Sequence, residues 1–123
     1  MTHTNESAEN YLEAILVLSQ RLPVVRSIDI ANYLNFSKPS VSVAMKNLRS
    51  KEYIEVSDAG FITLTDAGKE IADTIYERHT FLSQWLISLG VDEQIAVDDA
   101  CRLEHQISPE SFAAIKAYVN SGQ

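Results

Sequence analysis

Residues 37–51 read SKPSVSVAMKNLRSK, and this stretch decides the fold of the first half of the chain. Ser37 is a residue type that favours the N-cap of a helix. Pro39 suits a first helical turn, because its missing N–H would be unpaired there in any case. The apolar residues at helical spacing, which predict one buried side, are Val41, Met45 and Leu48. The stretch therefore predicts a capped, basic, amphipathic helix.

The segments before this helix are also helical in pattern. A short helix is expected over residues 28–34, with Ser27 as its N-cap, and a turn at 35–37 joins it to the basic helix. A longer amphipathic helix is expected over about residues 6–20. Two short helices joined by a turn of three or four residues, the second capped and basic, are typical of a helix-turn-helix.

Two short β-rich runs follow the basic helix. They cover residues 53–57 and 61–64 and flank Asp58-Ala59-Gly60, whose glycine can supply the positive φ that a tight hairpin requires. A hairpin directly after a helix-turn-helix is a wing. Residues 1–65 are therefore expected to form a winged helix-turn-helix domain.

The remainder of the chain predicts three more helices. One starts at Thr65 and runs over about residues 66–88, a second spans about 92–107, and a third is capped at Ser108 and ends near residue 120. Their apolar surface is too large for one copy to bury, so a homodimer through this region is expected. The predicted fold is mainly α, with the winged helix-turn-helix domain followed by a helical dimerisation domain at 66–123.

The charge of the chain is unevenly distributed. The sequence has 123 residues and a net charge of −7, which alone argues against a nucleic-acid partner. Residues 1–51, however, hold six basic and four acidic side chains, whereas residues 52–123 hold four basic and thirteen acidic ones. The basic stretch inside an acidic protein indicates a binding face.

Composition also restricts where the protein works. No apolar run approaches the roughly 20 residues that a membrane helix needs, and the first residues lack the pattern of a signal peptide. The single cysteine, Cys101, cannot form an internal disulfide. These features favour a cytoplasmic protein in a reducing compartment, with no membrane partner.

The basic helix carries side chains of the kinds that contact DNA phosphates. Lysines, serine hydroxyls and helix N-terminal amides are the usual phosphate ligands. The residues of this kind near its amino end are Ser37, Lys38, Ser40, Ser42 and Lys46. The alternative is a structural three-helix bundle whose basic face only meets solvent.

A second set of residues points to a metal. In the run Cys101-Arg102-Leu103-Glu104-His105, the first, fourth and fifth residues share one face of a helix. A thiolate, a carboxylate and an imidazole together suit a borderline transition metal better than magnesium or calcium. Three ligands on one helix cannot complete a coordination shell. Further candidates elsewhere are His79, Asn10 and Glu13, with Glu9, Asp98 and Asp99 as weaker ones. The alternatives are a buried core cysteine, a hydrogen-bonded histidine and solvated polar groups.

These stretches together resemble the diphtheria-toxin-repressor and manganese-transport-regulator family of metal-dependent repressors. The residues that carry the resemblance are 9–15 (ENYLEAI), 37–42 (SKPSVS), 64–68 (LTDAG), 78–79 (RH) and 98–105 (DDACRLEH). The resemblance covers nearly the whole chain. It implies a short form without the SH3-like third domain of longer members. It also implies that Ser37, Pro39 and Val43 lie near the bases, where Val43 can contact a thymine methyl group.

The resemblance also implies the metal ligands. Cys101, Glu104 and His105 match the ligand cluster of the family, while Glu13 and His79 match two further ligands of the manganese branch. Asn10 stands where the iron branch has methionine and the manganese branch has aspartate. Ser83 and Val97 replace ligands of the ancillary site of the iron branch, which implies that this site is lost in that form. The expected cofactor is Fe(II) or Mn(II), with Zn, Co or Ni as substitutes.

The expected function is a metal-dependent repressor that binds a double-stranded operator as a homodimer and controls metal homeostasis genes. The metal is expected to tie the first helix to ligands on the later helices and so to set the spacing of the two recognition helices. The alternative is a metal-independent winged-helix regulator that senses a small ligand or a redox change at Cys101. A metallohydrolase or cysteine enzyme built on Cys101 and His105 is disfavoured, because it would leave the wing and the basic helix without a role.

Overall fold

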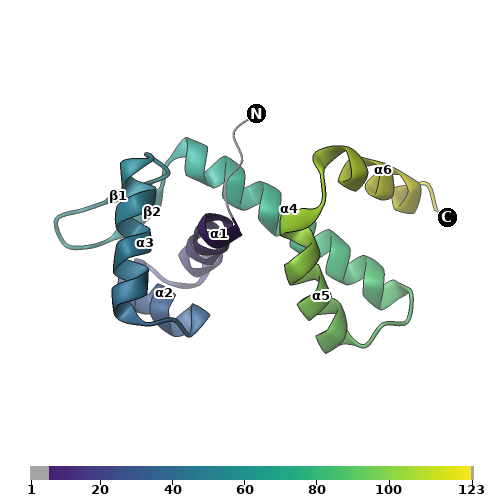
Figure 1. Ribbon diagram of the computed structural model, residues 1–123, viewed down its shortest axis with the longest axis horizontal. Coiled ribbons are helices and arrows are strands. Elements are labelled where there is room, and N and C mark those ends of the chain that lie inside the picture. Colours follow the sequence, from purple (N-terminus) through teal and green to yellow (C-terminus); the bar gives the residue numbers. More distant parts are fainter. Residues whose placement is uncertain (1–5, 123) are drawn as a thin grey trace. The chain divides into compact units, whose positions relative to one another are not determined.

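The computed structural model describes residues 6–122 and is mainly helical with one small hairpin (Figure 1). The elements are α1 (Glu6–Arg21), α2 (Ser27–Leu34), α3 (Lys38–Ser50), β1 (Ile54–Val56), β2 (Ile62–Leu64), α4 (Asp66–Ser88), α5 (Glu93–Gln106) and α6 (Pro109–Asn120). The predicted fold class is therefore confirmed. The chain separates into two compact units, one up to Asp73 and one from Thr74 onward, and each is described by itself.

The helix-turn-helix of the first unit consists of α2 and α3. The side chain of Ser37 accepts a hydrogen bond from the backbone N–H of Ser40 at 3.3 Å, so the predicted N-cap of α3 is confirmed. The predicted N-cap of α2 is wrong, because Ser27 is the first helical residue and Arg26 is the cap. The reason is that Asp29 accepts a hydrogen bond from the Arg26 backbone N–H at 2.9 Å, so the helix starts one residue earlier than predicted.

The core of the first unit lies among α1, α2, α3 and the hairpin. Apolar side chains from one face of each helix meet there, and the five below are 0–2% exposed. They are Leu12, Ile15, Ile30, Val41 and Leu48. This core fixes α3 by its apolar side and leaves the opposite side in solvent.

The hairpin is the predicted wing. Its strands pair antiparallel with Ile54 opposite Leu64 and Val56 opposite Ile62. Gly60 has φ +84°, which confirms the predicted positive φ in the turn. Ile62 also donates to the carbonyl of Val25 at 2.8 Å, so the segment before α2 pairs with the outer side of the wing.

The start of α4 is packed against the base of the wing. Thr65 caps the helix by accepting from the N–H of Gly68, and its hydroxyl donates to the carbonyl of Glu52. A Cβ on Gly68 would lie only 2.0 Å from the carbonyl oxygen of Tyr53. Only glycine therefore permits this approach between α4 and the loop that follows α3.

The second unit contains the rest of α4 with α5 and α6. Asp92 caps α5 and Ser108 caps α6. The buried core residues are Leu82, Ala100 and Phe112. Leu89 and Tyr118 are large apolar residues of this unit that are nevertheless 63% and 65% exposed. Among the described residues, no helix is long and apolar enough to cross a membrane.

Candidate metal centre

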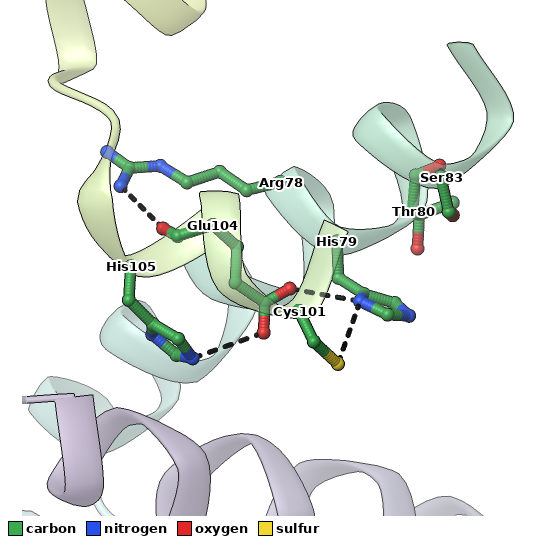
Figure 2. Close-up of polar contacts among 7 residues, drawn as sticks. All are labelled: Arg78, His79, Thr80, Ser83, Cys101, Glu104 and His105. Carbon is green, nitrogen blue, oxygen red and sulfur yellow. Dashed lines mark hydrogen bonds and ion pairs between the residues drawn. The ribbon is translucent and has the colours of Figure 1, made fainter. Parts of the chain in front are cut away.

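Three metal-ligating side chains come together between α4 and α5 (Figure 2). His79 comes from α4, and Cys101 and Glu104 come from one face of α5, where residues three apart are neighbours. Their ligand atoms, an imidazole nitrogen, a thiol sulfur and a carboxylate oxygen, all lie within 4.8 Å of one another. The structure thus brings the cysteine and glutamate of the 101–105 run together with the candidate on the long helix.

Glu104 is the most unusual residue of this cluster. It is 0% exposed, and neither carboxylate oxygen accepts a well-aligned hydrogen bond from the described residues. Two imidazole nitrogens are nonetheless close: His79 Nδ1 lies 3.0 Å from Oε2, and His105 Nε2 lies 3.3 Å from Oε1. A buried carboxylate needs a positive charge beside it, because isolated burial of an ion is costly.

His79 supplies that charge in the absence of a metal. A side-chain hydrogen bond with Cys101, followed by the contact with Glu104, raises the pKa of His79 from 6.5 to about 10. Burial acts in the opposite direction and is outweighed. At neutral pH, His79 is therefore an imidazolium next to the carboxylate, and a metal ion at this point would have to displace its proton.

These residues fit a divalent metal ion. A cation at the common point of the three ligand atoms would take the place of the His79 proton and use the carboxylate oxygens that lack hydrogen bonds. Thiolate and imidazole are ligands of transition metals, and a carboxylate suits manganese as well. His105, whose side chain is 2% exposed, borders the other carboxylate oxygen of Glu104, outside the group of three.

Arg78 holds the two helices together beside the cluster. Its Nη1 atom donates to the carbonyl oxygens of Glu104 at 3.1 Å and Ile107 at 3.2 Å, at the carboxyl end of α5. Its guanidinium also lies over the ring of Phe112, 5.8 Å from the centroid. This role could not be predicted from the sequence, because the acceptors are backbone carbonyls at the end of another helix and every residue carries such a group.

The other predicted ligands lie outside this cluster. Asn10 and Glu13 are half-buried residues of α1, in the first unit, so their ligand roles stay predictions. Ser83 is 6% exposed and donates to the carbonyl of Thr80 on its own helix. Figure 2 shows the side chains of Thr80 and Ser83 apart from those of His79, Cys101 and Glu104, with no marked contact between the two groups.

The candidate DNA-contacting residues form one exposed face of the first unit. All seven predicted residues lie at the start of α3 or on its solvent side, and Val43 is 61% exposed although it is apolar. They are Ser37, Lys38, Pro39, Ser40, Ser42, Val43 and Lys46. Val43 does not belong to the buried core of this unit, and its contact with a base stays a prediction.

Comparison with known proteins identifies both parts of the chain. Residues 3–60 match the family "Iron dependent repressor, N-terminal DNA binding domain", and residues 65–123 match "Iron dependent repressor, metal binding and dimerisation domain". The transcriptional regulator MntR of Salmonella typhimurium is 33% identical over 116 residues, which cover 94% of this chain and 74% of that protein. The HTH-type regulator MntR of Bacillus subtilis is 33% identical over 112 residues, covering 91% of this chain and 79% of that protein.

Solved structures agree with these matches. A manganese-dependent transcriptional repressor in complex with manganese is 27% identical, with a TM-score of 0.83, over 92% of this chain and 52% of the other. The metal-dependent regulator MtsR is 25% identical, with a TM-score of 0.85, over 92% and 53%. The chain thus spans about half the length of these solved proteins and about three quarters of the two MntR relatives. It belongs to the iron-dependent repressor family, whose members are metal-dependent transcriptional regulators rather than enzymes, and it combines the DNA-binding domain with the metal-binding and dimerisation domain of that family.

Proposed function

We propose that this protein represses transcription by binding operator DNA as a homodimer when Mn(II) or Fe(II) occupies the cluster of His79, Cys101 and Glu104. The observation that carries this proposal is the buried carboxylate of Glu104. Its two oxygens have no well-aligned hydrogen bond from the part of the chain that the structure describes, and each faces an imidazole. Such a group is stable only with a cation beside it. The ion would supply that charge and join α4 to α5.

The choice of metal follows from the ligand set. The exposed Cys101 thiolate favours Fe(II) or Zn(II), whereas the carboxylate and imidazole accept Mn(II) as well. Asn10 and Glu13 remain the predicted additional ligands from α1. Their contribution would tie the DNA-binding domain to the metal-binding domain, and the spacing of two recognition helices decides whether both reach one operator.

The test is a gel shift on duplexes selected from a random DNA pool in the presence of metal. We expect retardation with Mn(II) or Fe(II), loss with EDTA, and recovery when the metal is restored. Cys101→Ala and Glu104→Ala should both abolish the metal response. Asp99→Asn is the matched control, because this exposed carboxylate on the same helix pairs with Arg102 instead.

Two outcomes would reject the proposal. Operator binding that persists unchanged in EDTA would identify a metal-independent regulator. A defect in Cys101→Ala without a matching defect in Glu104→Ala would identify a redox or small-ligand sensor at the thiol, since only a shared metal makes the two residues equivalent.

A further inference from the structure

We infer that Arg78 is a positioning residue for the metal centre, which sets the reach of Glu104 toward His79 by capping the end of α5 from another helix. This inference rests on the proposed metal-binding function. Arg78 touches none of the three candidate ligand atoms. It acts on the backbone that carries one of them.

The carboxyl end of α5 needs such a partner. The last four carbonyls of a helix have no N–H partner within that helix, and a positive charge near them is favourable. The carbonyl of Leu103 receives the N–H of Ile107, whereas Arg78 donates to the carbonyls of Glu104 and Ile107. One guanidinium nitrogen therefore holds both the last turn of α5 and the first residue beyond it.

The position of Arg78 in the sequence makes this clamp relevant to the metal. The next residue is His79, so one turn of α4 provides both a ligand and the group that fixes the backbone of Glu104. The facing atoms, His79 Nδ1 and Glu104 Oε2, are 3.0 Å apart. Without the clamp, the end of α5 is free to fray, and the carboxylate loses its fixed distance from the imidazole.

A further detail supports a role beyond general packing. The Nε atom of Arg78 is buried and has no hydrogen-bond partner among the described residues. A buried N–H without a partner is unfavourable. The guanidinium also lies over the ring of Phe112, and its Nη1 atom reaches both carbonyls. The Nε donor thus stays without a partner among the described residues, while Nη1 bonds both carbonyls at the end of α5.

The test compares Arg78→Met, Arg78→Lys and the control Lys116→Met. Lys116 joins α6 to α4 through a 2.7 Å ion pair with Glu77, so this control also removes a cation that contacts α4. Mn(II) affinity is measured by titration, and the ligand geometry is measured from the absorption spectrum of the Co(II)-loaded protein. Far-UV circular dichroism of the metal-free variants tests whether each one is folded.

We expect Arg78→Met to weaken Mn(II) binding by about 10- to 100-fold and to change the Co(II) spectrum, as loss of a ligand-orienting group does. Arg78→Lys should recover part of the affinity, because lysine keeps the charge but not the planar fork. Lys116→Met should lower the melting temperature without moving either metal readout. If Arg78→Met does not fold, Arg78→Lys decides, with a several-fold loss expected.

Unchanged affinity and an unchanged Co(II) spectrum in a folded Arg78 variant would overturn the inference. A loss of the same size in Lys116→Met would also overturn it, because the effect would then follow stability alone. Failure of the proposed function would be distinct: the wild-type protein itself would not bind Mn(II), or would bind it equally well after Glu104→Ala.

Discussion

The Nδ1 atom of His79 lies 3.0 Å from the Oε2 atom of Glu104, and Glu104 is completely buried. One helix therefore presents a proton-bearing ring to a carboxylate on another, with the Cys101 sulfur 3.9 Å from the same ring nitrogen. A single position next to His79 Nδ1 is thus the meeting point of three groups that bind either a proton or a metal ion. Several expected properties of the protein follow from this competition.

The first expectation concerns the basicity of His79 in the metal-free protein. Since the contact with Cys101 is the larger cause of its raised pKa and Glu104 the next, Cys101→Ser and Glu104→Gln should both move the value from about 10 toward 6.5. The measurement is the pH dependence of the His79 Cε1–H resonance in EDTA-treated protein. Asp99→Asn should leave it unchanged, and an unaltered titration in both cluster variants would contradict the geometry.

The second expectation concerns protons released on metal binding. Because His79 is charged below about pH 10 and must be neutral to act as a ligand, Mn(II) should displace about one proton from it near pH 7.5. Apparent affinity should therefore rise with pH up to about 10. Calorimetric titrations in buffers of different ionisation enthalpy measure the release, and His79→Ala should release about one proton fewer.

The same pKa has the opposite effect on the stability of the metal-free fold. The folded-state pKa lies above the ordinary 6.5, so the stabilisation from charged His79 is fully present below pH 6.5 and is lost as pH rises toward about 10. Denaturant unfolding in EDTA should show stability falling across this window. Glu104→Gln should flatten the slope, and a slope of the opposite sign would exclude the imidazolium–carboxylate pair.

The third expectation concerns the exposed face of α3. Lys38→Met and Lys46→Met should each weaken operator binding about equally for all sequences, because phosphate contacts carry no sequence information. Each should also reduce the slope of log affinity against log salt by about 1. Lys69→Met is the control, since Lys69 is paired with Asp73 on α4. If neither recognition-helix lysine changed the salt slope, the assigned face would be wrong.

The fourth expectation concerns Gly68. Glycine-to-alanine changes in helices usually stabilise, but here the new Cβ would meet the Tyr53 carbonyl at 2.0 Å. Gly68→Ala should therefore lower the free energy of unfolding by about 1–3 kcal/mol through overpacking. The exposed Ala67→Gly isolates helix propensity, with a loss of roughly 0.5–1 kcal/mol. A gain in stability for Gly68→Ala would show that the helix can shift away from the loop.

Local features of the fold were predictable from the sequence. The caps at Ser37 and Ser108, the positive φ of Gly60 and the apolar faces of the helices follow from residue types and their spacing. The N-cap of α2 was not predictable in this way. Serine is a good cap in general, but the Asp29 carboxylate accepts from the Arg26 backbone N–H and so sets the start of the helix.

The candidate site was predictable only in part. Helical spacing placed Cys101, Glu104 and His105 on one face of α5, but it did not predict how deeply each side chain is buried. The complete burial of Glu104 and the exposure of Cys101 depend on where α4 passes, and so does the capping of α5 by Arg78. Such features arise from contacts between helices far apart in sequence, which periodicity within one helix does not contain.

The graded exposure of the three ligands has a kinetic consequence. The sulfur of Cys101 belongs to an exposed residue, the His79 side chain is 23% exposed and Glu104 is sealed from water. An arriving ion would shed its hydration in that order, with capture starting at the thiolate and finishing at the carboxylate. Release would follow the reverse path, so we expect the buried carboxylate to influence the residence time of an ion and the exposed sulfur to influence its rate of capture.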